Sequence, residues 1–136
     1  AIPMGFAAQT HSTNLTAWLT FAAAVCMTIA YDTYYAMVDR EDDLKIGVKS
    51  TAVLFGSWDL AIIAAFQAVC VGLLFAVGLI NNLNSPFYLG LAVMAGLFIY
   101  QNHLGRSREN NNYFKAFINN HWAALSVWIG LLVNYI

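Results

Sequence analysis

Four long apolar segments constrain the fold of this chain more than any other feature. They cover residues 15–38, 60–80, 87–104 and 115–136, and charged residues make up only 10% of the sequence. An α-helix rises about 1.5 Å per residue, so about 20 apolar residues cross a hydrocarbon core of about 30 Å. Because 60% of the residues are hydrophobic, little polar surface remains to face water. The pattern predicts an all-α, polytopic membrane helix bundle with about four transmembrane helices.

The polar connections between these segments are alternately charged and uncharged. The basic residues fall in two of them, namely Arg40, Lys45 and Lys49 in one and Arg106, Arg108 and Lys115 in the other. Residues 9–14 and 81–86 contain no basic residue. Because positively charged loops tend to stay on the cytoplasmic side, we expect the loop 39–57 to be cytoplasmic and the C-terminus to lie outside.

Single residues predict how the helices begin and pack. Asp59 stands in the first turn of the second apolar segment, where a carboxylate is favoured by the helix dipole. Pro86 suits the first position of the third helix. Small residues let membrane helices approach closely. We expect this role for four glycines: Gly72, Gly78, Gly90 and Gly96.

Acidic residues are concentrated at the end of the first of these segments. Five of the seven lie between positions 32 and 43, and they are Asp32, Asp39, Glu41, Asp42 and Asp43. If the helix continues through position 43, Asp39 and Asp43 lie one turn, about 6 Å, apart on one face. Asp32 lies about 10 Å further along the axis, so one ion does not easily bind all three. As a costly carboxylate within a membrane span, Asp32 is a separate functional candidate.

Two interpretations of the Asp39–Asp43 pair remain open at this point. Two carboxylates suit a hard cation such as Mg²⁺ that is shared with substrate phosphates, and nearby basic side chains would bind the remaining phosphate oxygens. Alternatively, the stretch is a solvated loop with local pairing of its charges. An EF-hand does not fit, because its required glycine falls on Leu44 and its final glutamate on Ser50.

A family resemblance decides between them. Residues 31–43 (YDTYYAMVDREDD), followed by residues 45–51 (KIGVKST), closely resemble the second Asp-rich motif of the UbiA-type intramembrane prenyltransferases, specifically the 4-hydroxybenzoate polyprenyltransferases of ubiquinone biosynthesis. Residues 113–120 (YFKAFINN) resemble the last cytoplasmic loop of that family. The resemblance extends over residues 1–136 as the C-terminal half of such an enzyme. The first Asp-rich motif of the family, Asn-Asp-x-x-Asp, is absent here, so we expect a partial domain that does not complete the active site alone.

The resemblance implies a Mg²⁺-dependent aromatic prenyltransferase in the bacterial inner membrane. In this family Mg²⁺ bridges the Asp-rich motifs to the diphosphate of a polyprenyl donor, and the resulting allylic cation alkylates 4-hydroxybenzoate beside its hydroxyl group. By position, Asp39 and Asp43 match the metal-binding pair, and we expect Asp32 to bind or polarise the aromatic acceptor. The remaining candidates are Arg40, Lys45 and Lys49 for the diphosphate, with Arg40 alternatively paired to Glu41 or Asp43, and Tyr34 and Tyr35 for shielding the cation or for packing.

Other function classes fit less well. A CDP-alcohol phosphotransferase would need Asp-Gly and Ala-Arg pairs that this stretch lacks. An ion-coupled transporter using Asp32 predicts a helix broken by glycine or proline beside the charge, whereas residues 17–38 contain neither. Six basic residues against seven acidic ones give no basic face for nucleic acid.

Overall fold

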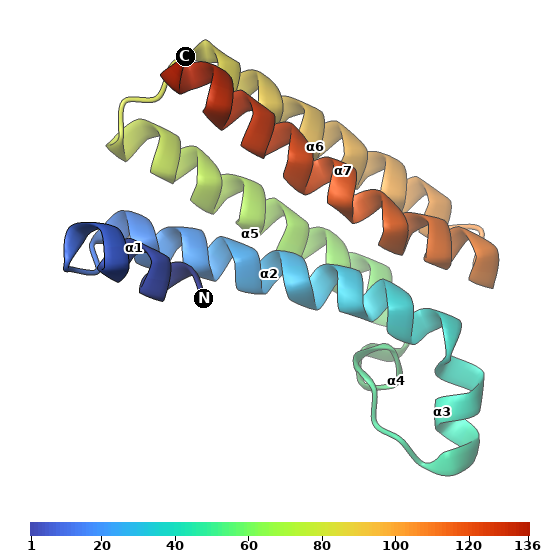
Figure 1. Ribbon diagram of the computed structural model, residues 1–136. Helices are drawn as coiled ribbons and strands as arrows, with labels where there is room; N and C mark the ends of the chain where they lie inside the picture. Colours follow the sequence, from blue (N-terminus) through green and yellow to red (C-terminus); the bar gives the residue numbers. More distant parts are fainter.

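The computed structural model describes residues 1–136, which form helices and no strands. Four long helices, each antiparallel to the one before it, make an up-and-down bundle, and the short helix α1 folds back along α2 (Figure 1). The four predicted apolar segments are confirmed as its long helices. In chain order the elements are α1 (Ile2–Thr10), α2 (Leu15–Val38), α3 (Arg40–Ile46), α4 (Thr51–Phe55), the 3₁₀ turn η1 (Gly56–Trp58), α5 (Asp59–Ile80), α6 (Ser85–Gly105) and α7 (Asn110–Tyr135).

The bundle consists of two closely packed helix pairs, α2 with α5 and α6 with α7. Between α6 and α7 the backbones themselves meet. A Cβ atom on Gly90 would lie 2.4 Å from the carbonyl oxygen of Ser126, and one on Gly130 would lie 2.6 Å from that of Pro86. Real Cβ atoms do not approach a carbonyl oxygen so closely, so this helix pair depends on glycine at both positions.

The prediction that four glycines serve helix packing is confirmed for two of them. Gly78 and Gly90 face neighbouring helices, and a Cβ on Gly78 would lie 2.8 Å from the ring of Phe87. For Gly72 and Gly96 the prediction is wrong, because a Cβ there meets no atom within 4 Å. Both lie on outward faces of their helices, which the presence of glycine alone does not reveal.

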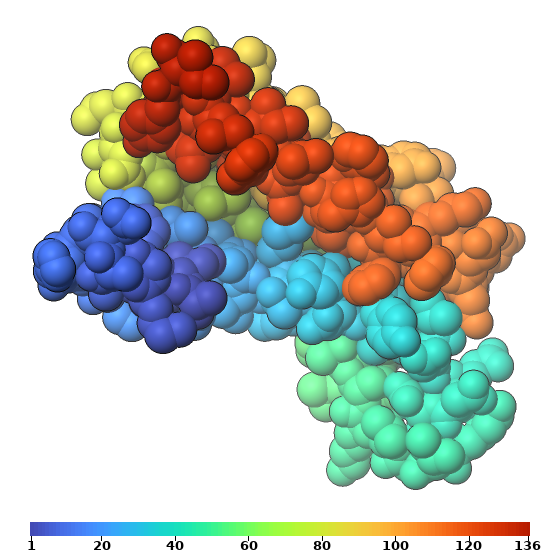
Figure 2. Space-filling model, in the orientation of Figure 1, coloured from blue at the N-terminus to red at the C-terminus, as the bar shows by residue number.

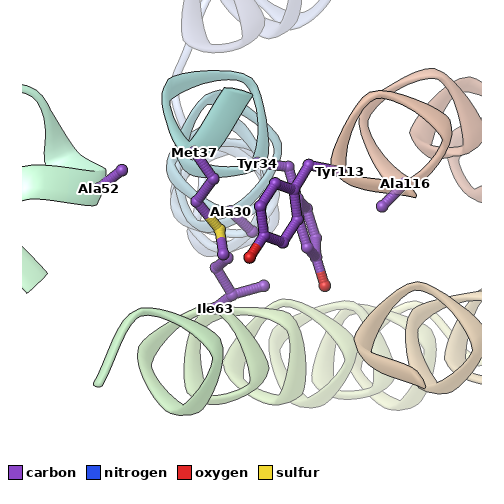
Figure 3. Close-up of a cluster of buried hydrophobic side chains, with 7 residues drawn as sticks. All are labelled: Ala30, Tyr34, Met37, Ala52, Ile63, Tyr113 and Ala116. Atoms are coloured by element: carbon purple, nitrogen blue, oxygen red, sulfur yellow. The ribbon is translucent and has the colours of Figure 1, made fainter. Parts of the chain in front are cut away.

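Apolar side chains cover much of the outer surface, and the interior is small. Only 25 of the 136 residues are buried, whereas Leu89 is 68% exposed and Ile99 72% exposed. Such extensive exposed apolar surface suits contact with lipid. One buried cluster lies where α2, α4, α5 and α7 meet (Figure 3), and it contains Ala30, Tyr34, Met37, Ala52, Ile63, Tyr113 and Ala116.

A row of amide side chains connects three helices across the bundle. Gln67 of α5 donates to Oε1 of Gln101 in α6 at 2.9 Å, and Gln101 donates to Oδ1 of Asn119 in α7 at 3.0 Å. Gln67 and Gln101 are both buried. Because buried polar groups are costly without partners, these bonds specify how the three helices align.

Three helical stretches are long and apolar enough to cross a membrane: Leu15–Val38, Thr51–Ile80 and Asn110–Tyr135. The fourth predicted span, α6, is a helix of 21 residues packed against α7, but it ends in the polar residues Gln101, Asn102 and His103. The membrane helix bundle is thus confirmed, with three of its four long helices meeting the criteria of length and composition.

Helix α2 does not continue into the acidic stretch. It ends at Val38, Asp39 has φ −92° and ψ 2°, and α3 begins at Arg40. Figure 2 shows that α3 and α4 project from the end of the bundle. Three acidic residues in the first turn of α3 favour a new helix start through the helix dipole. The condition of one continuous helix through position 43 is therefore not met, whereas the predicted end of the first long segment at residue 38 agrees with the end of α2.

Candidate active site

Asp39 and Asp43 remain one helical turn apart despite the break. The amide nitrogen of Asp43 donates to the carbonyl oxygen of Asp39 at 2.9 Å, which closes the first turn of α3. Gly47, with φ 74°, ends the helix and donates its N–H to the carbonyl oxygen of Asp43. These backbone bonds hold the two acids in register, with Asp39 exposed and Asp43 half-buried.

The carboxylates of Asp39 and Asp43 form no hydrogen bond or ion pair with another side chain, in contrast to Asp42. The Asp42 carboxylate accepts a hydrogen bond from Lys45 at 2.8 Å. This bond lowers the pKa of the Asp42 carboxyl group below its ordinary value. Free carboxylate oxygens one turn apart fit a hard divalent cation. The chain contains no group of three or more His, Cys, Asp or Glu side chains placed to hold a metal ion.

Asp32 is not brought to this pair. It is exposed within α2, seven residues before the break at Asp39. Helix α2 is uninterrupted over its 24 residues. The broken helix that a transporter would place beside Asp32 is therefore not present.

Tyr34 and Tyr35 take different positions. Tyr34 is fully buried in the cluster of Figure 3, and its hydroxyl group has no hydrogen-bond partner. Tyr35 is half-exposed, with its ring centroid 5.3 Å from that of Phe117 in α7. Both rings pack against neighbouring helices, and Tyr35 also faces outward.

The three basic candidates have different environments. Lys45 is paired with Asp42 at the surface, and Lys49 is exposed between α3 and α4. Arg40 donates from Nη1 to Asp59 at 3.0 Å and from Nη2 to the carbonyl oxygen of Gly56 at 2.6 Å. The alternative pairing of Arg40 with Glu41 or Asp43 is not observed, because its partners are Asp59 and Gly56. An ion pair with the buried Asp59 is less screened by water than one at the surface, which favours this partner.

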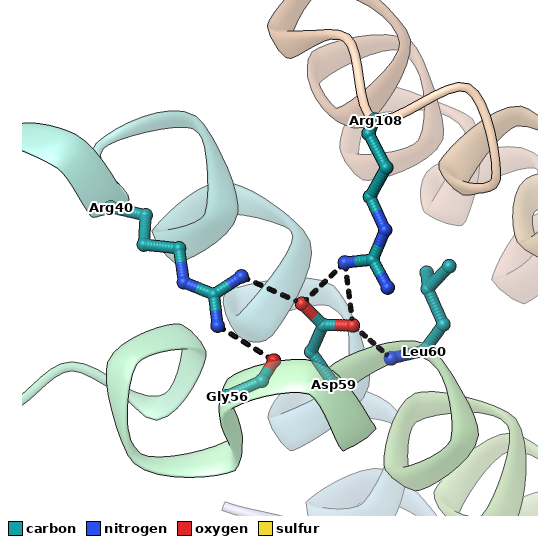
Figure 4. A network of polar contacts seen from close by, with 5 residues as sticks. All are labelled: Arg40, Gly56, Asp59, Leu60 and Arg108. Carbon is teal, nitrogen blue, oxygen red and sulfur yellow. Dashed lines mark hydrogen bonds and ion pairs between the residues drawn. The ribbon is translucent and has the colours of Figure 1, made fainter.

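Asp59 and Arg108 form part of this region although the sequence did not identify them as site residues. Nη1 of Arg108 donates to both carboxylate oxygens of Asp59, at 2.8 and 2.7 Å (Figure 4). This hydrogen bonding raises the pKa of the Arg108 guanidinium. The two residues are 49 positions apart, so no local motif links them. The one indication in the sequence was that Asp59 begins an apolar helix. This start was expected on the same side of the membrane as the two basic connections.

An apolar cavity of about 600 Å³ lies at the opposite end of the bundle. Residues from α1, α2, α5, α6 and α7 line it, including Phe6, Leu74 and Trp128. None of the candidate site residues contributes to its wall. The charged residues and the main cavity therefore occupy different ends.

Sequence comparisons identify relatives along the whole chain. A 4-hydroxybenzoate octaprenyltransferase from Azotobacter vinelandii is 54% identical over 134 residues, covering 98% of this chain and 45% of that protein. The protein of the same name from Hahella chejuensis is 50% identical over 135 residues, covering 99% of this chain and 45% of its own length. This chain thus spans slightly less than half the length of these relatives. No solved structure matches it.

Membership of a family rests on the extent of the match as well as on identity. Residues 1–132 match the UbiA prenyltransferase family, so the match includes the acidic stretch and the four long helices except for the last three residues of α7. This confirms the resemblance found in residues 31–51 and 113–120. The chain belongs to the UbiA prenyltransferase family.

Proposed function

We propose that this chain is part of a 4-hydroxybenzoate polyprenyltransferase of ubiquinone biosynthesis. In the proposed reaction, the bond between the allylic carbon and the diphosphate oxygen of a polyprenyl diphosphate breaks. A carbon–carbon bond then forms at the ring position beside the hydroxyl group of 4-hydroxybenzoate. The ring loses a proton, and diphosphate is released.

The observation that best supports this proposal is the free Asp39–Asp43 pair at the charged end of the bundle. By contrast, Asp42 binds Lys45 and Asp59 binds two arginines. The relatives named as 4-hydroxybenzoate octaprenyltransferases support the choice of acceptor and donor class.

The donor set fits Mg²⁺, with Asp39 and Asp43 as its protein ligands. Mg²⁺ binds proteins through one or two carboxylates and keeps its other positions for water and substrate phosphates. When bound, it supplies Lewis-acid neutralisation of the departing diphosphate. The hydrogen-bonded turn between Asp39 and Asp43 keeps the two carboxylates at a fixed spacing for this purpose.

The other side chains take supporting roles in the proposal. Lys49 and Lys45 bind diphosphate oxygens, with Lys45 first released from its exposed pair with Asp42. Asp32 binds or polarises the aromatic acceptor. Arg40 is held by Asp59 and Gly56, so its contribution to diphosphate binding is mainly its positive charge.

In this proposal the site is completed by the part of the enzyme that corresponds to the remaining length of the relatives, which this chain does not cover. The protein is embedded in the lipid bilayer of the bacterial inner membrane, with the acidic loop on the cytoplasmic side where the soluble aromatic acid is available. Residues 1–136 alone, reconstituted in lipid vesicles, are expected to give no transfer. Turnover by this chain alone would contradict that expectation.

Substitution of single carboxylates in the complete enzyme tests the function. Asp39→Asn and Asp43→Asn are each expected to lower Mg²⁺-dependent transfer of polyprenyl to labelled 4-hydroxybenzoate by about 100-fold or more, since metal stabilisation is worth several kcal/mol. Asp42→Asn is the matched control, because it removes a neighbouring charge that is already paired with Lys45. Near-normal transfer by either Asp39→Asn or Asp43→Asn, with protein present in the membrane, would contradict the proposal.

A further inference from the structure

Asp59 is the most highly bonded charged residue of the chain. It is 0% exposed and lies at the start of α5. Its carboxylate accepts hydrogen bonds from Arg40, from Arg108 and from the backbone N–H of Leu60 at 2.6 Å (Figure 4). Both of its oxygens are therefore satisfied within the protein.

The two arginines reach this carboxylate from separate parts of the chain. Arg40 is the first residue of α3, and Arg108 lies in the connection between α6 and α7. Their side chains are 27% and 45% exposed, whereas that of Asp59 is completely buried. Removing one partner of a buried ion pair is strongly destabilising, because the remaining charge is left uncompensated. The buried carboxylate thus fixes two otherwise mobile arginine side chains.

The backbone conformation of Arg108 is also unusual for the residue that contacts Asp59. Arg108 has φ 57°, a left-handed conformation that residues other than glycine rarely adopt. Such a conformation is unfavourable and persists only where the surroundings determine it. The backbone N–H of Arg108 donates to the carbonyl oxygen of Gly105, and its side chain donates twice to Asp59, so both the turn and the ion pair hold this conformation.

Helix α3 has few other contacts that fix its direction. It contains no buried residue, and it follows the break at Asp39 that separates it from α2. Arg40 therefore provides its main polar attachment to the bundle, through Asp59 and the carbonyl oxygen of Gly56. Asp39 and Asp43 lie on either side of this attachment point.

We propose that Asp59 is a positioning residue for the Asp39–Asp43 turn. Through Arg40 it sets the direction in which this turn leaves α2. Through Arg108 it connects the turn to the segment between α6 and α7. Asp59 touches neither metal nor substrate in this role. Its effect on catalysis rests on the proposed function, because it is exerted on the two carboxylates assigned there. Its effect on the position of α3 does not depend on that assignment.

Distance measurements in the complete enzyme test the structural part directly. Spin labels are attached at Leu44→Cys in α3 and Asn111→Cys in α7, both at exposed positions, in a background of Cys26→Ala and Cys70→Ala. With Asp59 intact, a single narrow distance distribution is expected. Asp59→Asn is expected to shift or broaden it, whereas Asp42→Asn leaves it unchanged. An unchanged distribution in Asp59→Asn would overturn the proposal.

Arg40→Gln provides a second variant if Asp59→Asn does not fold. It preserves the pair between Asp59 and Arg108, so the buried charge keeps a partner. It is expected to broaden the same distribution, and an unchanged distribution in this variant would equally overturn the proposal.

Kinetics then test the catalytic part. Asp59→Asn is expected to raise the Mg²⁺ concentration for half-maximal transfer by roughly 10- to 100-fold, as found for residues that orient metal ligands. The KM for 4-hydroxybenzoate should stay constant, because Asp59 does not contact the acceptor. Unaltered Mg²⁺ dependence together with a displaced α3 would overturn this part. Full activity of Asp39→Asn would instead contradict the proposed function, and the distance measurement would still decide the role of Asp59.

Discussion

The hydroxyl group of Ser126 in α7 donates a hydrogen bond to the carbonyl oxygen of Gly90 in α6, at 3.0 Å. The backbone carbonyl group of Ser126 occupies the space where a side chain on Gly90 would begin. The two helices therefore meet through their backbones at this point. Close backbone approach of this kind increases van der Waals contact, which is a principal source of helix association in membranes.

Gly90→Ala is expected to destabilise the protein by about 1–3 kcal/mol, because the added methyl group forces α6 away from α7. Unfolding in detergent measures this change. Gly96→Ala on the same helix is the control, since its Cβ meets no atom within 4 Å, and it should be neutral or slightly stabilising. Equal effects of the two substitutions would contradict the close contact between α6 and α7 at Gly90.

Gln101→Leu is expected to lower the free energy of unfolding by about 1–2 kcal/mol. The substitution removes the partner of the Gln67 amide and of the Asn119 carbonyl oxygen, and unpaired buried polar groups are costly. The double variant Gln67→Leu/Gln101→Leu should lose less than the sum of the single variants, because both belong to one hydrogen-bond network. Strict additivity would show that the amides do not interact.

Gly47→Ala should destabilise the end of α3 by about 1–2 kcal/mol, because Gly47 has φ 74° and other residues are strained in that conformation. Steric contact is not the cause, since a Cβ there would meet nothing within 4 Å. Faster amide hydrogen exchange at Val48, which donates to the carbonyl oxygen of Asp43, reports the loss. Gly5→Ala in α1, also without a steric contact, should not accelerate exchange at that amide.

Single cysteines in the Cys26→Ala, Cys70→Ala background test the membrane orientation. Ser12→Cys and Asn82→Cys lie in the uncharged connections and should react with an impermeant maleimide in intact cells. Val48→Cys and Ser107→Cys lie in the charged connections and should react only after the cells are permeabilised. The reverse pattern would invert the proposed orientation, and labelling of all four in intact cells would contradict the alternation itself.

The long helices were predictable because each corresponds to a continuous apolar segment. The α5–α6 turn was predictable because it depends on local residues such as Pro86. Helix α6 begins at Ser85 with Pro86 in its first turn, as expected. The end of α2 agrees with the predicted end of the apolar segment at residue 38, but the new helix α3 beginning at Arg40 was not predicted, because residues 39–57 were expected to form a polar loop. The acidic first turn of α3 was the available indication.

The ion pairs of Asp59 were not predictable in the same way. A favourable helix dipole was a sufficient local explanation for this residue, whereas its actual partners lie 19 and 49 positions away. Only the packing of α5 against the neighbouring elements brings the two arginines to one carboxylate. Similarly, Gly90 and Gly96 are six residues apart on one helix, and their different roles follow from which face meets α7.

The division of the bundle into two helix pairs sets where its charged contact and its cavity lie. Within each pair the long helices are closely packed, and the packing between the pairs is less extensive. Asp59 and Arg108 bridge the two pairs at the charged end, while the cavity beside Leu74 and Trp128 opens between them at the far end. The two helix pairs are therefore joined by a buried carboxylate at one end and separated by an apolar hollow at the other.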